Sequence, residues 1–283
     1  PLTAVMESDK ASEEVKAACK EYLDPFQVGA TNGAAADKLV EVLSGCDCDT
    51  CKEIVKNKDF LAKKSQWIFG GDGWAYDIGF GGLDHVIASG EDVNILVFDT
   101  EVYSNTGGQA SKSTRTGAIA QFAAGGKETK KKDLAGIAMS YGYVYVAQVS
   151  MGADYNQCLK AFQEAESYNG PSIIIAYAPC INHGIKKGMS KAQTEEKLAV
   201  EAGYWNNFRF DPRKAEEGKN PFTLDSKAPT GDYQEFLMGE VRYASLAKAN
   251  PARAEKLFGK SESEATAKYA YLQKLQKMYA PEE

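Results

Sequence analysis

The sequence predicts an α/β fold in which helices flank a mostly parallel β-sheet. Uninterrupted apolar runs recur between residues 67 and 177, and segments with helical patterns separate them. Apolar runs without polar alternation are typical of parallel strands that are covered on both faces. Their alternation with helices indicates βαβ units.

The elements of this core are predicted in order along the chain. The expected strands are Trp67–Phe69, Asn94–Phe98, Val144–Val149 and Ser172–Tyr177. The expected helices between them are Trp74–Ser89, Lys132–Tyr141 and Asp154–Tyr168. Because ligands of such sheets bind beyond the carboxyl ends of the strands, we expect a site in the loops that follow the strands.

Three segments are expected: a helical lead or insertion over residues 1–66, the α/β core over 67–184, and a helical C-terminal extension over 185–283. Apolar residues at helical spacing support the first segment. Helices expected in the extension are Lys191–Ala202, Tyr233–Ala249 and Glu262–Met278.

Composition and charge exclude several classes of protein. The chain has 283 residues, a net charge of −6 and a pI near 5.3. An acidic chain is not expected to bind nucleic acid, which selects a basic face. No apolar run approaches the roughly 20 residues that span a bilayer, and no signal peptide is visible. We therefore expect a cytoplasmic protein without a membrane segment. Because the chain begins with Pro1, we expect either processing or a piece of a longer chain.

The segment from Gly70 to Gln109 has the pattern of a diphosphate and Mg²⁺ site. Gly71-Asp72-Gly73 lies between a predicted strand and a predicted helix, so glycines permit close approach of a ligand and the helix start favours an anion. Asp72 offers a carboxylate oxygen, which Mg²⁺ prefers. The loop after the next strand lies beside it, where Thr100 can offer a hydroxyl and Val102 a carbonyl.

Two longer stretches give this segment a family resemblance. Gly-Asp-Gly-Trp-Ala-Tyr-Asp-Ile-Gly at 71–79 and Asp-Thr-Glu-Val-Tyr-Ser-Asn-Thr-Gly-Gly-Gln at 99–109 resemble pyruvate:ferredoxin oxidoreductases. The resemblance extends through Ala-Pro-Cys-Ile-Asn-His at 178–183. Thiamine-diphosphate enzymes usually carry Asn-Asn where this chain has Asp99-Thr100, and this family has Asp-Thr there.

The resemblance implies roles for individual residues. Mg²⁺ would be held by Asp72, Thr100 and the carbonyl of Val102. The cofactor-binding residues would be Gly71, Asp72, Gly73, Trp74, Thr100, Val102, Asn105 and Thr106. Asn105 would be catalytic, next to the thiazolium and within reach of the substrate. Cys180 would be the fourth ligand of a [4Fe–4S] cluster whose other ligands lie elsewhere in the longer chain.

The resemblance also implies an activity and partners. The whole enzyme would oxidatively decarboxylate pyruvate with coenzyme A, passing electrons through iron–sulfur clusters to ferredoxin or flavodoxin, as a homodimer. The strands expected before residue 1 are missing, so the sheet would be truncated at its N-terminal side. Two alternatives stay open: another 2-oxo acid as substrate, or a non-catalytic isolated fragment that holds half a site.

Two features have simpler interpretations. Cys46, Cys48 and Cys51 include a Cys-x-x-Cys pair, but no second Cys or His pair lies nearby, so a polar loop with incidental thiols is favoured over a metal site. Lys130-Lys131-Lys132 is interpreted as a solvated face, with an acidic partner or coenzyme A as the lesser alternative.

Overall fold

The computed structural model describes residues 1–9 and 11–281, and the chain divides into two compact units, Pro1–Gln66 and Trp67–Glu283. Each unit has its own hydrophobic core. Within the described residues, no helix combines the length and the apolar character needed to cross a membrane.

The first unit is helical, with α1 (Leu2–Met6), α2 (Glu13–Leu23), α3 (Gly29–Ser44), α4 (Asp49–Lys56) and a 3₁₀ turn at Lys58–Phe60. The hydroxyl of Ser12 caps α2 by accepting a hydrogen bond from the Val15 amide at 3.3 Å. The core of this unit contains Cys19, Leu39, Leu43 and Cys51, which are all at most 1% exposed.

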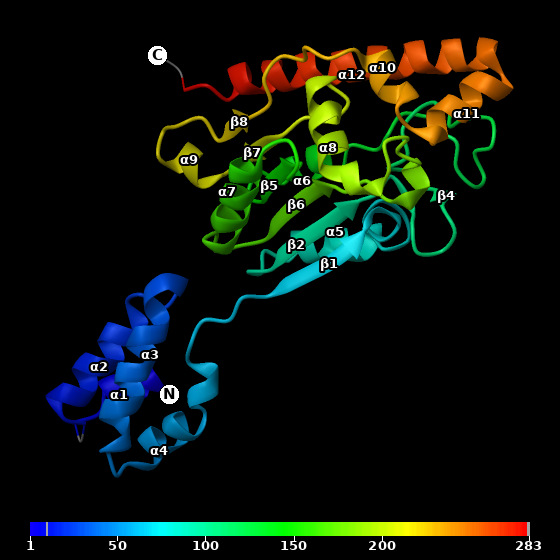
Figure 1. Ribbon diagram of the computed structural model, residues 1–283. Coiled ribbons are helices and arrows are strands. Elements are labelled where there is room, and N and C mark those ends of the chain that lie inside the picture. The colour runs from blue at the N-terminus through cyan, green and yellow to red at the C-terminus, as the bar shows by residue number, and fades with distance from the viewer. Residues whose placement is uncertain (10, 282–283) are drawn as a thin grey trace. The chain divides into compact units, whose positions relative to one another are not determined.

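The second unit is built on a six-stranded sheet in the order β1-β2-β6-β5-β7-β8 (Figure 1). The strands are β1 (Trp67–Gly71), β2 (Asn94–Asp99), β5 (Tyr145–Val149), β6 (Ser172–Tyr177), β7 (Phe208–Phe210) and β8 (Phe222–Leu224). The first four are parallel to one another, whereas β7 and β8 are antiparallel to their neighbours. The predicted fold class, helices around a mostly parallel sheet, is therefore confirmed.

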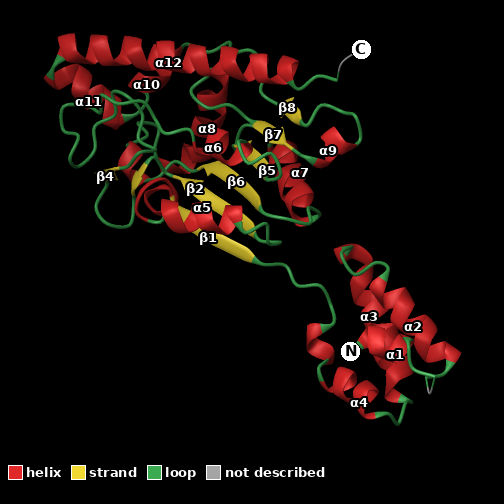
Figure 2. Ribbon diagram, turned by 180° about the vertical axis from the view of Figure 1, so that it is seen from behind, coloured by secondary structure: helices red, strands yellow, loops and turns green. Residues whose placement is uncertain are grey.

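Helices cover both faces of this sheet. On one face, seen in Figure 2, α5 (Phe80–Ala88) packs through Leu83 and Ile87 on Ile95 and Val97 of β2, and α6 (Leu134–Met139) belongs to the same core. On the other face, α7 (Tyr155–Glu166) packs on a core that contains Leu96. Successive residues of β2 therefore point to opposite cores, which explains its continuous apolar run.

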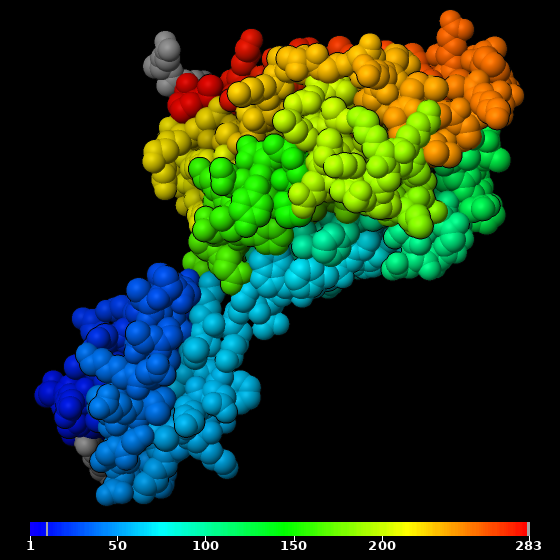
Figure 3. Space-filling model, viewed as in Figure 1, coloured from blue at the N-terminus to red at the C-terminus, as the bar shows by residue number. Residues whose placement is uncertain are grey.

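The C-terminal part of the unit closes over the sheet. Its helices are α8 (Ala192–Glu201), α9 (Arg213–Glu216), α10 (Tyr233–Met238), α11 (Val241–Ala249) and α12 (Pro251–Met278). Leu257, Phe258 and Leu272 of α12 enter the same core as α5. The space-filling view shows the segments of α7 and α8, green and yellow-green, at the surface on the side of Figure 1 (Figure 3).

The predicted helical extension over residues 185–283 also contains two strands that the sequence did not indicate. This segment contributes β7 and β8 to the sheet, each only three residues long. Strands of that length have too few positions for a recognisable period. The last helix also begins at Pro251 rather than Glu262, because Asn250 caps it by accepting from the Arg253 amide and proline suits the first helical position.

The turn after β1 winds as a π-helix over Gly73–Ile78 before α5 begins, where one longer helix was expected. The Gly79 amide donates to the carbonyl of Trp74 at 2.8 Å. The ring of Trp74 folds back between two glycines: a Cβ on Gly70 or on Gly79 would lie 2.1 Å from it. These glycines therefore make room for a tryptophan of the same chain.

This packing predicts opposite effects for two neighbouring substitutions. Gly79→Ala should destabilise the second unit by about 1–3 kcal/mol, because its methyl group overlaps the Trp74 ring. Gly82→Ala is the matched control: its Cβ would meet no atom within 4 Å, so α5 should gain up to about 1 kcal/mol. Urea unfolding followed by tryptophan fluorescence measures both, since Trp67, Trp74 and Trp205 all lie in this unit. Equal stability of the two variants would contradict the packing argument.

Candidate functional site

The first two strands of the sheet end side by side. They pair in parallel with Gly71 opposite Phe98, so the loops that follow both strands meet at the same edge. Asp72 comes directly after β1 and is 1% exposed. Thr100 comes directly after β2.

The carboxylate of Asp72 joins these two loops. Its Oδ1 accepts a hydrogen bond from the hydroxyl of Thr100 at 2.7 Å and another from the Thr100 amide at 3.2 Å. The same hydroxyl oxygen lies 3.0 Å from the carbonyl oxygen of Val102. The Thr100 hydroxyl is therefore within hydrogen-bonding distance of both the Asp72 carboxylate and the Val102 carbonyl. These are the three groups that the sequence analysis assigned to one ion.

Ser111 is a further contact of Asp72 that the sequence did not suggest. Its hydroxyl donates to Oδ2 of Asp72 at 2.5 Å. Ser111 follows the short strand β4 (Gln109–Ala110), which pairs with β3 (Val102–Tyr103) as a hairpin. The hairpin places Ser111 next to Asp72, which lies 39 positions earlier in the chain. No spacing pattern in the sequence predicts this contact.

The electrostatics of Asp72 differ from those of a surface carboxylate. Burial, with the charge of the neighbouring Asp99, raises the pKa of Asp72 to about 7, against the opposing hydrogen bonds from Ser111 and Thr100. This carboxylate therefore holds a proton near neutral pH more readily than usual.

Asp99 makes its hydrogen bonds and its ion pair with other side chains than Asp72 does. The hydroxyl of Tyr76 donates to Asp99 at 2.7 Å, and the Nζ atom of Lys131 lies 2.7 Å from its Oδ2. Ser113 donates to its other oxygen. Of the pair Asp99-Thr100, the threonine is the residue that donates hydrogen bonds to Asp72.

Glu101 ties this loop to the rest of the unit. It is fully buried and has a positive φ of 58°, a conformation that non-glycine residues rarely adopt. Its carboxylate lies 3.0 Å from Lys131, 3.2 Å from Arg115 and 2.9 Å from Arg242 of α11, and the hydroxyl of Tyr204 donates to it. Burial alone would raise the pKa of Glu101, but the three cations hold it well below its usual range.

The solvated-face interpretation of Lys130–Lys132 was wrong for its central residue. The side chain of Lys131 is 14% exposed, because it bridges Asp99 and Glu101. Lys132 is half-buried with its Nζ atom 3.0 Å from the centre of the Phe80 ring, and Lys130 alone is exposed. The sequence cannot distinguish three consecutive lysines. The fold shows that Lys131 is the one that pairs with Asp99 and Glu101.

Asn105 and Thr106 lie in the turn of the β3–β4 hairpin and are exposed. Gly107 and Gly108 complete the turn with φ angles of 119° and 77°, which favour glycine. A Cβ on Gly108 would lie 2.9 Å from the side chain of Asn182. The hairpin turn therefore packs closely against the segment that follows β6.

That segment carries Cys180, which is half-buried. The Cys180 amide donates to Nδ1 of His183 at 3.0 Å. Burial and the charge of Arg242 hold the pKa of His183 well below its usual range, so its imidazole is neutral. Cys158, the other cysteine of this unit, is buried in α7.

A family model matches the centre of the chain. Residues 55–176 match the thiamine pyrophosphate enzyme, C-terminal TPP binding domain. This range contains the Asp72 cluster, the hairpin and the first five strands.

Curated relatives match most of the chain. It is 57% identical to the pyruvate:ferredoxin oxidoreductase of Moorella thermoacetica over 93% of its length, and 56% identical over the same share to the pyruvate-flavodoxin oxidoreductase of Klebsiella pneumoniae. It is 53% identical over 88% of its length to the mitochondrial pyruvate dehydrogenase [NADP(+)] of Euglena gracilis. The chain spans 23%, 23% and 13% of these relatives.

The buried ion cluster predicts a large effect for one isosteric substitution. Glu101→Gln should destabilise the second unit by roughly 3 kcal/mol, because it leaves Arg115, Lys131 and Arg242 without their shared anion. Glu128→Gln is the control, since it removes a carboxylate paired with Arg253 at the surface and should change stability much less. Denaturant unfolding followed by tryptophan fluorescence compares them. A Glu101→Gln protein as stable as the control would show that the cluster does not hold the loop.

Proposed function

Because the chain is homologous over most of its length to a part of the pyruvate:ferredoxin and pyruvate-flavodoxin oxidoreductases, we propose that it forms the diphosphate and Mg²⁺-binding wall of their thiamine-diphosphate site. The observation that carries this proposal is the meeting of Asp72, Thr100 and the Val102 carbonyl at one edge of the sheet.

The donor set suits Mg²⁺. All three atoms are hard oxygens, the class that this ion selects. One hydroxyl hydrogen on Thr100 faces two acceptors, the Asp72 carboxylate and the Val102 carbonyl, and can serve only one of them at a time. A cation among the three oxygens would satisfy all of them. In our proposal these residues hold the ion, which in turn binds the diphosphate.

The backbone beside Asp72 supports a diphosphate contact. A Cβ on Gly71 would meet nothing closer than the Phe98 carbonyl at 4.0 Å, so the main chain here is open to a ligand. Gly73 and Trp74 begin the helical turn and offer amide groups to an anion. The side chains near them serve packing: a Cβ on Gly73 would lie 2.6 Å from the Tyr103 ring.

The substrate end of the site is assigned to the hairpin turn. When bound, thiamine diphosphate supplies the carbanion stabilisation that decarboxylation of a 2-oxo acid requires. The exposed amide of Asn105 would orient the carboxylate or the developing oxyanion of the substrate, and Thr106 would contact the cofactor beside it. Gly107 and Gly108 hold the turn in the shape that presents these two residues.

An iron–sulfur cluster needs ligands that this unit does not hold by itself. A [4Fe–4S] cluster takes four thiolates, and residues 67–283 contain only Cys158 and Cys180. Cys180 is half-buried beside the hairpin turn, a position that supports its assignment as one ligand. The other ligands would come from the remainder of the longer chain.

The whole enzyme is proposed to oxidise pyruvate with coenzyme A to acetyl-coenzyme A and CO₂, releasing a pair of electrons to ferredoxin or flavodoxin. Names of the matched relatives support pyruvate and both carriers. Assembly with the rest of its chain as a homodimer and a cytoplasmic location complete the proposal. Since one relative is mitochondrial, cell fractionation is the test of location.

A second proposal follows from the short span of the match. The chain covers less than a quarter of the relatives' length, so we propose that in isolation it holds half a site and lacks activity. Calorimetry with Mg²⁺ and thiamine diphosphate on the 283-residue chain tests this second proposal. Weak or undetectable binding supports this second proposal, and tight binding contradicts it.

The Mg²⁺ assignment predicts the effect of one substitution in the complete enzyme. Asp72→Asn should weaken Mg²⁺-dependent binding of thiamine diphosphate by roughly 100-fold or more, because it removes the anionic ligand. Asp84→Asn is the matched control: this α5 carboxylate accepts from Tyr141 and lies outside the cluster. Calorimetry at saturating Mg²⁺ measures both. Unchanged affinity in Asp72→Asn would refute the assignment.

The raised pKa of Asp72 predicts a pH dependence. A cation binds the ionised carboxylate and a proton competes for it, so Mg²⁺ affinity should be constant well above pH 7. Below the pKa of about 7 it should fall by about tenfold per pH unit. The same titration on Asp72→Asn corrects for protonation of the diphosphate. Identical slopes in the two proteins would show that Asp72 is not the titrating ligand.

Substrate choice is tested on the intact enzyme. Turnover of pyruvate should exceed that of 2-oxoglutarate, and preference for the latter would reverse the substrate assignment. Asn105→Ala should lower kcat/KM for the 2-oxo acid by about 100-fold, since one positioned amide is lost. Its affinity for thiamine diphosphate should stay close to wild type, because the Asp72 cluster is intact. Wild-type kcat/KM in this variant would remove Asn105 from the reaction.

A further inference from the structure

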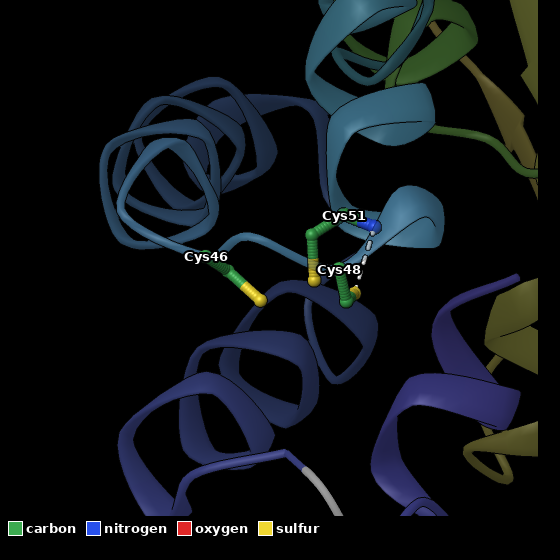
Figure 4. A group of neighbouring side chains, drawn as sticks. All are labelled: Cys46, Cys48 and Cys51. Carbon is green, nitrogen blue, oxygen red and sulfur yellow. Dashed lines mark hydrogen bonds between the residues drawn. The ribbon is translucent and has the colours of Figure 1, made fainter.

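Three cysteines of the first unit converge, although they come from different positions around one loop. Cys46 lies in the connection between α3 and α4, Cys48 is the residue that caps α4, and Cys51 lies in the first turn of that helix. Their Sγ atoms all lie within 4.8 Å of one another. Figure 4 shows the three side chains directed toward a common space.

The local backbone holds this arrangement. The Cys51 amide donates to Sγ of Cys48 at 3.2 Å, and the Cys46 amide donates to the carbonyl of Leu43 at the end of α3. An amide hydrogen bond to sulfur stabilises a thiolate, as does the positive end of the helix on which Cys48 lies.

Burial of the three side chains is graded. Cys51 is fully buried in the core of the unit, Cys46 is half-buried against that core, and Cys48 is exposed. The cluster therefore has an inner side fixed by the core and an outer side open to solvent. This is the form of a site with three protein ligands and one further position.

We propose that Cys46, Cys48 and Cys51 bind a thiophilic divalent cation of the Zn²⁺ class, with its fourth position open on the side of Cys48. Thiolates select such soft or borderline ions over Mg²⁺ or Ca²⁺. Tetrahedral Zn–S bonds of about 2.3 Å place sulfur atoms about 3.8 Å apart, so a cluster within 4.8 Å needs only a small contraction.

The proposal revises the interpretation of these residues from sequence alone. Spacing showed a Cys-x-x-Cys pair without a second pair, which counted against a metal. In the structure, Cys46 lies beside this pair, so a third thiol ligand comes from the same loop. Since Cys51 belongs to the core, a bound ion would fix the α3–α4 connection to the helical body. Metal binding would add to the stability of a unit of only 66 residues, whose hydrophobic core is small.

Metal binding by the 283-residue chain tests this proposal, with thiols reduced and chelators removed. Zn²⁺ affinity is measured by competition with a chromophoric chelator, and Co²⁺ serves as a spectroscopic probe. We expect about one Zn²⁺ per chain and a Co²⁺ complex with thiolate charge-transfer absorption and tetrahedral d–d bands. Cys46→Ser and Cys48→Ser should each weaken Zn²⁺ binding at least about tenfold.

Two controls keep the result specific. Cys158→Ser, in the other unit, should bind Zn²⁺ as the wild type does, and so should Asp72→Asn, which separates this site from the Mg²⁺ site. Cys51→Ser alters the core of the unit, so the test uses Cys46→Ser and Cys48→Ser, and circular dichroism of the helices checks that both variants are folded. A reduced wild-type chain that takes up no Zn²⁺ would overturn the proposal. Wild-type affinity in Cys46→Ser and Cys48→Ser would also overturn it.

Discussion

The buried carboxylate of Glu101 is the contact on which the candidate site depends. A non-glycine residue with positive φ is strained, and a buried charge is costly, so both persist only where the surroundings compensate them. Three cations and the Tyr204 hydroxyl provide that compensation. Because Arg242 comes from α11, the C-terminal helices determine the shape of a loop that follows the second strand.

This loop gives each successive residue a different task. Asp99 points inward to Tyr76 and Lys131, Thr100 turns to Asp72, and the reversal at Glu101 returns the Val102 carbonyl to the Thr100 hydroxyl. The pair Asp99-Thr100 is therefore not a substitute that supplies two ligands. Its threonine contacts Asp72 and the Val102 carbonyl, where we propose that Mg²⁺ binds, and its aspartate pairs with Lys131, which also pairs with Glu101.

Much of the core could be predicted because its signals are local. The four parallel strands are apolar runs buried on both faces, and the meeting of Asp72 with Thr100 follows from adjacent strands ending at one edge. What the sequence did not reveal depends on contacts between distant segments. Ser111 reaches Asp72 through a hairpin, Lys131 is distinguished from its neighbours only by the acidic loop, and β7 and β8 are too short for a period. Cys46, Cys48 and Cys51 are close in the sequence, but their convergence depends on the conformation of the turn before α4, which spacing does not show.

The most direct test of the metal assignment is to locate the ion. Mn²⁺ replaces Mg²⁺ in sites of oxygen ligands and is visible by anomalous X-ray scattering. In a crystal of the complete enzyme with Mn²⁺ and thiamine diphosphate, the anomalous peak should lie about 2.0–2.3 Å from Oδ of Asp72, Oγ1 of Thr100 and the Val102 carbonyl oxygen. A diphosphate-bound Mn²⁺ peak whose protein ligands are other residues would contradict the account.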